Sequence, residues 1–194
     1  MKEYQSTYQE QEYSKDPIQK THWWNTAFQL QTIDRLQPSE YIHTLAKQHI
    51  QNEIGYNEIY QSLGQYYEDL EKNPIKAKEI QQTRVKEADT VSTRIVELLD
   101  QGQFELKPSV LNAIHHYLFQ DVLPEYMTPG EYRTTNISKK ENMLQGESVA
   151  YSPFFQIGDS IAYDFKEEMA KDYSKMTKEE ALHSVQSFVS GLWQ

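Results

Sequence analysis

The sequence predicts a mainly α-helical fold that carries one short β-hairpin. Apolar residues recur at intervals of three and four positions through most of the 194-residue chain, which is the spacing of amphipathic helices. The pattern changes at residues 121–130, where two prolines and a glycine indicate a loop. Two β-like runs follow on either side of Gly146, and this arrangement is typical of a hairpin.

The first 20 residues predict a disordered tail. Tyr4, Tyr8 and Tyr13 stand among glutamine and glutamate, with almost no aliphatic residues. Such a segment buries too little apolar surface to offset the entropy lost on ordering.

Residues 21–72 predict a small module of three helices. The first helix covers residues 21–34, Ser39 is the expected N-cap of the second, and a third helix follows a turn at residues 52–57. The expected buried residues share helical spacing. They are Trp23, Trp24, Ala27, Leu30, Ile33, Ile42, Leu45, Ala46, Ile50, Ile59, Leu63, Tyr66, Tyr67 and Leu70.

Asn73 and Pro74 mark a boundary, and residues 75–194 form a second predicted region. One long helix is expected over residues 75–99, ended by Gly102, and a shorter one over residues 109–119. The β-like runs at residues 131–138 and 148–151 come next. Two further helices are expected over residues 155–173 and from Thr177, which forms a capping box with Glu180. The last helix has one apolar stripe of Ala181, Leu182, Val185, Phe188, Val189 and Leu192.

Composition excludes several classes of function. The chain has no cysteine, so disulfides and thiolate metal sites are ruled out. Its formal net charge of −10 argues against nucleic acid as a partner, because phosphate contacts need clustered Lys and Arg. No apolar stretch is long enough for a transmembrane helix, and no secretory signal is apparent. We expect no membrane partner and a cytoplasmic location.

Searches for common catalytic motifs find none. The sequence has no Gly-x-Gly-x-x-Gly, Walker or Gly-x-Ser-x-Gly pattern. Six histidines occur without a His-x-x-x-His pair, and no metal site is predicted. His115 and His116 are adjacent in a predicted helix, so their rings are expected to point to different faces, one near the core and one toward solvent.

Several motifs together resemble the Fic family of protein adenylyltransferases, over about residues 83–194. Residues 114–122 are similar to the family's Ile-His-x-x-Leu-Phe segment, and residues 129–133 to its Ala-Gly-x-x-Arg segment. Residues 136–141 are similar to the Asn-Ile-Ser-Lys flap. The returning flap strand, the first core helix and the run before the family signature resemble residues 148–151, 87–95 and 188–194.

The resemblance implies a Fic-like helical bundle with a β-hairpin flap. Intact family members transfer AMP from ATP, with Mg²⁺, to a hydroxyl side chain of a target protein. Asn136, Ser138, Lys139 and Lys140 match flap positions that meet nucleotide and target, although they can also be read as ordinary polar hairpin residues. The target protein is the implied partner of the hairpin.

Residues 21–72 resemble, more weakly, the helical module found before some Fic domains and their small antitoxin partners. Those inhibitors carry Ser/Thr-x-x-x-Glu-Gly/Asn. The nearest matches here are Thr83 to Glu87 and Thr93 to Glu97, followed by Ala88 and Leu98. Neither completes the motif, so an ordinary helix surface is the favoured reading over inhibition.

The family's catalytic motif, His-x-Phe-x-Asp/Glu-Gly-Asn-x-x-Arg, is absent, because no glycine of this chain is followed by asparagine. We therefore assign no catalytic or metal residue and expect no tight ATP or Mg²⁺ binding by this chain. The motif is expected within a few residues after Gln194, so either the gene is truncated, or the rest is encoded elsewhere, or the given chain is a fragment. The alternative is a non-catalytic binding protein, a Fic remnant that acts as a decoy or inhibitor. An antitoxin or a second copy is a further possible partner.

Overall fold

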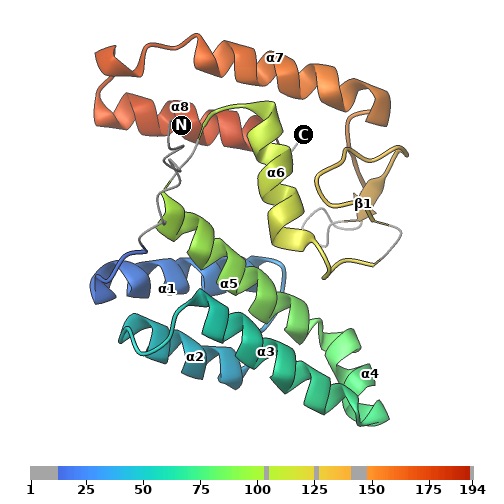
Figure 1. The fold of residues 1–194 in the computed structure, drawn as a ribbon. Helices are drawn as coiled ribbons and strands as arrows, with labels where there is room; N and C mark the ends of the chain where they lie inside the picture. Colours follow the sequence, from blue (N-terminus) through green and yellow to red (C-terminus); the bar gives the residue numbers. More distant parts are fainter. Residues whose placement is uncertain (1–12, 103–104, 125–126, 141–147, 193–194) are drawn as a thin grey trace, which may run out of the picture. The chain divides into compact units, whose positions relative to one another are not determined.

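The computed structural model describes residues 13–102, 105–124, 127–140 and 148–192, and these are mainly helical (Figure 1). The chain divides into two compact units. The first comprises the described residues up to 102 together with residues 118–124 and Met127. Its helices are α1 (Pro17–Ile33), α2 (Glu40–Ile50), α3 (Tyr56–Glu71), α4 (Pro74–Thr83) and α5 (Val85–Gln101).

The second unit comprises residues 105–117 and 128–140 with residues 148–192. It holds most of α6 and every later element. These are α6 (Pro108–Phe119), β1 (Ser138–Lys140), β2 (Ser148–Ala150), η2 (Phe154–Gln156), α7 (Ile157–Met169), η3 (Tyr173–Lys175) and α8 (Lys178–Gly191).

The start of α1 corrects the predicted tail. Residues 1–12 lie outside the described part, but residues 13–20 are ordered. Asp16 caps α1 by accepting from the Ile18 amide, with Pro17 at the first helical position. The Ser14 amide donates to the Asp100 carboxylate at 2.8 Å, and the Lys20 side chain is buried. The prediction failed here because it weighed only the scarcity of aliphatic residues and not these polar contacts.

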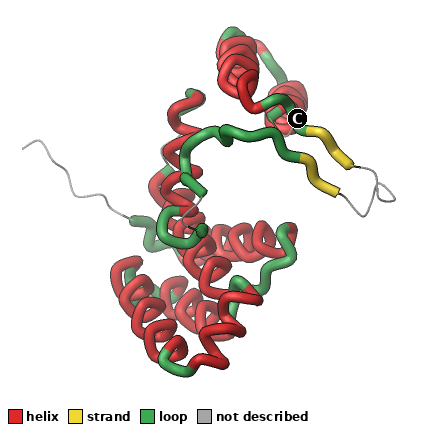
Figure 2. Tube along the Cα trace, turned by 90° about the vertical axis from the view of Figure 1, so that its right-hand side faces the viewer, coloured by secondary structure: helices red, strands yellow, loops and turns green. Residues whose placement is uncertain are grey.

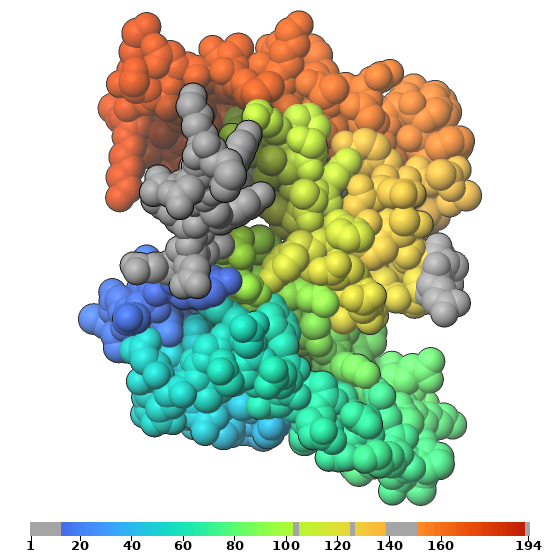
Figure 3. Space-filling view, in the orientation of Figure 1, coloured from blue at the N-terminus to red at the C-terminus, as the bar shows by residue number. Residues whose placement is uncertain are grey.

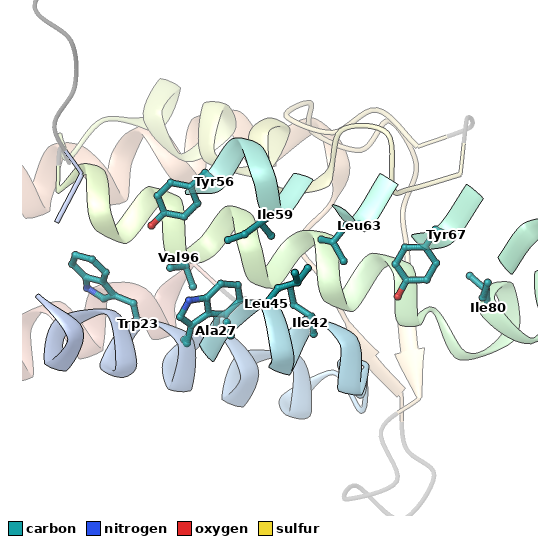
Figure 4. Close-up of a cluster of buried hydrophobic side chains, with 12 residues drawn as sticks. Trp23, Ala27, Ile42, Leu45, Tyr56, Ile59, Leu63, Tyr67, Ile80 and Val96 are labelled. Carbon is teal, nitrogen blue, oxygen red and sulfur yellow. The ribbon is translucent and has the colours of Figure 1, made fainter. Parts of the chain in front are cut away.

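A single apolar cluster forms the core of the first unit. Figure 4 shows side chains from α1, α2, α3 and α5 directed toward one another. The residues of this cluster that are almost completely buried are Trp24, Ala27, Ile42, Ile59, Tyr67 and Val96. Because α5 packs against α1 and α3, the first unit continues past the boundary expected at Asn73 and Pro74.

The predicted long helix over residues 75–99 is wrong, since the structure has two helices there. Arg84 lies between them in the left-handed conformation, with φ of 54°. Its guanidinium donates to both Glu87 carboxylate oxygens, at 2.8 and 2.5 Å. A bidentate ion pair of this kind fixes the turn in place, and apolar periodicity contains no sign of it.

A buried carboxylate joins three helices of the first unit. Asp89 of α5 is fully buried and accepts from the Ser39 amide at 2.8 Å, the Ser39 hydroxyl at 2.5 Å and the Tyr67 hydroxyl at 2.7 Å. Burial raises the Asp89 pKa, while these donors oppose the rise. Ser39 also caps α2, as predicted, by accepting from the Ile42 amide.

Two short strands are present in the second unit, and they pair antiparallel. The two strands lie side by side in Figure 2. Ser138 lies opposite Ala150, Lys139 opposite Val149 and Lys140 opposite Ser148. The first β-like run was expected over residues 131–138, yet residues 131–137 form no strand. Over residues 131–137, hydrogen bonds made by the Arg133 and Asn136 side chains take the place of strand-to-strand backbone hydrogen bonds.

The predicted capping box at the start of α8 is confirmed. Thr177 and Glu180 exchange side-chain and backbone hydrogen bonds. The helix packs on α7 through Phe165 and Phe188, whose ring centroids lie 5.0 Å apart, edge to face. Glu168 of α7 is also buried there.

Three donors surround the Glu168 carboxylate. Lys171 donates at 2.6 Å, Ser184 of α8 at 3.0 Å, and the Tyr173 hydroxyl also donates to it. Burial opposes ionisation, but these hydrogen bonds outweigh it and lower the Glu168 pKa below its usual range. The group thus ties α7, η3 and α8 together.

The apolar stripe of α8 is only partly covered. Leu182, Val185 and Val189 are 56%, 44% and 49% exposed, whereas Phe188 is half-buried against α7. The helix therefore presents an apolar face to solvent in the described structure.

Candidate functional site

The candidate site is the base of the strand pair, where residues 128–137 return to residues 151–154. Arg133 donates to the Thr135 carbonyl at 2.8 Å and also to the Ser152 carbonyl. Asn136 accepts from the Phe154 amide at 2.9 Å. These bonds cross from one side of the pair to the other, so they set the position from which β1 and β2 extend.

Gly130 brings this segment close to α6. Its φ is +87°, and a Cβ placed there would lie 2.8 Å from the His116 Cβ and 3.0 Å from the Asn112 carbonyl oxygen. Only glycine avoids both the backbone strain and the clash. The contact between this loop and α6 therefore requires glycine at position 130.

Both histidines of α6 contact the same loop. The His115 Nδ1 accepts from the Gly130 amide at 2.8 Å, and the His116 Nδ1 lies 3.0 Å from the Pro129 carbonyl oxygen. A carbonyl only accepts, so the His116 Nδ1 is the donor. Both residues are exposed, so the expectation that one packs near the core is wrong. Partial burial, then the neighbouring His116, lowers the His115 pKa.

A hollow of about 660 Å³ lies beside the stem of the strand pair. Arg133, Tyr151 and Ser152 line one side. Asp159, Ser160, Tyr163 and Asp164 of α7 line another, with Gly191 and Leu192 at the end of α8. The space-filling view shows the surface of residues 128–138, in yellow, adjoining that of α7, in orange (Figure 3).

The charged residues of this lining are one arginine and two aspartates. The Arg133 guanidinium donates to two backbone carbonyls, and Asp159 and Asp164 of α7 line the same hollow. Within the described ranges, no group of three or more histidine and acidic side chains can hold a metal ion. We therefore derive no catalytic step from these residues.

The four predicted flap residues take different places. Asn136 bonds to the Phe154 amide, so it has a structural contact at the base of the pair. Ser138 is exposed at the start of β1. Lys139 and Lys140 are in β1, and their side chains lie outside what the structure describes. The α7 wall of the hollow, with Asp159 and Tyr163, was not predicted, because solvated polar positions on a helix leave no distinctive pattern.

The two antitoxin-like glutamates are both occupied within the first unit. Glu87 is 8% exposed and paired with Arg84, so describing it as ordinary helix surface was wrong. Glu97 accepts from the Tyr13 hydroxyl at 2.9 Å and from the Tyr60 hydroxyl at 2.6 Å. Both carboxylates therefore form hydrogen bonds that stabilise the first unit.

Comparisons with protein-family models, with curated proteins and with solved structures find no significant match to this chain. None of the described helices is long and apolar enough to cross a membrane.

Proposed function

We propose that this chain is the target-positioning part of a Fic-type protein adenylyltransferase and that its second unit presents an extended strand to a target protein. The observation that carries the proposal is the order of the motifs. Residues 114–122, 129–133, 136–141 and 148–151 follow one another as in that family.

The geometry of the second unit supports this assignment. The segments that carry the resemblance lie close together, because Gly130 packs on α6 while Arg133 and Asn136 bind the opposite side of the stem. An antiparallel strand pair fixed at its base offers backbone N–H and C=O groups at its edges. Such edges bind extended peptide segments by strand addition.

We further propose that residues 1–194 alone transfer no AMP. The sequence lacks the Gly-Asn pair of the family's catalytic motif, which in intact members helps to hold the phosphates. Loss of several cooperating groups costs orders of magnitude in rate.

Labelling with radioactive ATP tests both statements. The purified chain is incubated with Mg²⁺, labelled ATP and cell lysate, beside a fusion that adds the His-to-Arg segment and following helices of an intact Fic protein. We expect labelled protein only with the fusion, and no label when the signature His of the fusion is changed to Ala. Labelling by the short chain would refute the second proposal, and an inactive, folded fusion would refute the first.

A binding protein without catalysis is the second candidate. The exposed Leu182, Val185 and Val189 on α8 favour it, because apolar surface of this kind marks interaction sites. Addition of the 194-residue chain to an active Fic enzyme separates the two candidates. A decoy or inhibitor that binds the enzyme lowers the labelling rate even when the target is in large excess, whereas a positioning unit competes only for the target and leaves that rate unchanged.

A further inference from the structure

A second hollow, of about 320 Å³, lies in the first unit, between the start of α1, the end of α2 and the start of α3. Lys20 and His49 contribute polar side chains to its lining, and Tyr13, Ile54 and Tyr56 contribute apolar surface. It is separate from the candidate site in the second unit, and nothing in the proposed function uses it.

Lys20 is a buried cation without a carboxylate bonded to it. Its side chain is 4% exposed, and its ammonium donates to the His49 carbonyl at 3.1 Å and to the Asn52 amide oxygen at 2.9 Å. Lys20 forms no ion pair within the described part of the chain. An ammonium has three N–H donors, so one remains after these two bonds. Burial lowers the Lys20 pKa, and the charge of Asp100 partly opposes this.

The Asp100 carboxylate is itself occupied. It accepts from the Ser14 amide at 2.8 Å and from the Tyr56 hydroxyl at 2.9 Å. Asp100 therefore interacts with Lys20 through space, by attraction between the two charges, and no hydrogen bond between them is present. The remaining N–H of Lys20 is therefore available to an acceptor in the hollow.

His49 supplies a second donor. Its side chain is 1% exposed, and its Nδ1 accepts from the Trp24 indole at 3.1 Å. The neutral ring therefore carries its proton on Nε2. The Nε2 atom has no hydrogen-bond partner among the described residues. The ring lies beside that of Tyr56, with centroids 4.6 Å apart.

We propose that this hollow binds a small monocarboxylate with a planar apolar body. One carboxylate oxygen accepts from the Lys20 ammonium and the other from the His49 Nε2–H, while the body packs on Tyr13 and Tyr56. Two donors and one positive charge match a single carboxylate. Phosphate has more acceptor oxygens than these two donors serve.

Nuclear magnetic resonance of the full 194-residue chain tests the proposal at pH 7. The assigned indole N–H of Trp24 is the reporter, since it bonds to His49. We expect sodium benzoate to shift this resonance saturably, whereas its neutral isostere benzamide, sodium chloride at equal ionic strength and sodium phosphate leave it in place. N-acetylphenylalanine distinguishes a free small acid from the carboxylate at the end of a peptide, and binding of either supports a carboxylate site.

Two lysine variants complete the experiment. Lys20→Met keeps the apolar stem and removes the ammonium, so benzoate should bind at least tenfold more weakly. Lys15→Met is the matched control, because Lys15 lines the same hollow but is exposed, and it should bind within twofold of the wild type. If Lys20→Met fails to fold, the wild-type comparison of benzoate with benzamide decides. No saturable benzoate shift, an equal shift with benzamide or phosphate, or equal weakening by Lys15→Met would overturn the proposal.

Discussion

At the scale of single residues, the most informative positions are those where local rules are broken and the surroundings compensate. Arg84 adopts a left-handed backbone and pairs with Glu87, Gly130 approaches α6 at positive φ, and Lys20 is buried. The apolar periodicity of the sequence does not predict the contact that each of these residues makes.

Gly130→Ala is expected to destabilise the second unit by about 2 kcal/mol or more, because the added methyl group meets His116 and the backbone must hold positive φ. Gly158→Ala in α7 is the control. Its Cβ meets nothing nearer than 3.9 Å, and alanine favours a helix. Urea unfolding measures both variants. Equal stability of the two would contradict the close contact at Gly130.

The stability of the first unit should depend on pH through His49. Burial, and secondarily the charge of Lys20, lowers the His49 pKa to about 4, against about 6.5 in an unfolded chain. The stabilisation is therefore complete above pH 6.5 and is lost as the pH falls toward 4, by about 2 to 3 kcal/mol. In His49→Gln this part of the pH dependence should vanish, whereas His22→Gln, at an exposed position, should keep it. Urea midpoints at pH 7.5 and 4.5 provide the measurement.

At the scale of elements, the sequence predicted most helices and missed where some of them begin and end. The helix after Pro108, the cap at Ser39 and the capping box at Thr177 follow from local signals and are confirmed. The break at Arg84 was missed because it depends on an ion pair. The extra turn of α1 has a local signal, Asp16 as cap followed by Pro17, which was overlooked, and the contact of Ser14 with Asp100 adds to it.

The candidate site was predictable only in part. The resemblance pointed to Asn136, Ser138, Lys139 and Lys140, and the structure adds Arg133 as a residue that holds the stem. The buried Lys20 was also missed. It stands three and four residues before Trp23 and Trp24, so its place on the apolar stripe of α1 was the available signal.

The packing of α7 on α8 should depend on Glu168. Glu168→Gln removes the charge that Lys171 binds and weakens the acceptor for Tyr173 and Ser184, at a cost of about 1 to 3 kcal/mol. Glu167→Gln is the control, since that neighbouring side chain is exposed. Hydrogen exchange of α7 and α8 peptides should accelerate only in the Glu168 variant. Unchanged exchange there would show that the carboxylate does not hold the two helices together.

At the scale of the whole molecule, the exposed apolar face of α8 is expected to promote association. Leu182, Val185 and Val189 together present more apolar surface than single scattered residues do. Sedimentation coefficients should rise with protein concentration for the wild type. Changing all three residues to Gln should abolish the rise.

Ile18 and Ile75 allow a matched comparison for this association. They are 81% and 78% exposed and lie on α1 and α4 of the first unit. Changing both to Gln should leave the concentration dependence as in the wild type. A wild-type chain that sediments as a compact monomer at every concentration would contradict the role of the α8 face.

The buried carboxylate of Asp89 has a consequence for how this chain can vary through evolution. Ser39, the cap of α2, and Tyr67 of α3 both donate to it, and Asp89 and Tyr67 are buried. A change at any one of the three leaves the others with an unmet donor or acceptor. Among natural relatives, positions 39, 67 and 89 should therefore be inherited as a set, and a lineage that replaces the aspartate with an apolar residue should also have exchanged the serine and the tyrosine.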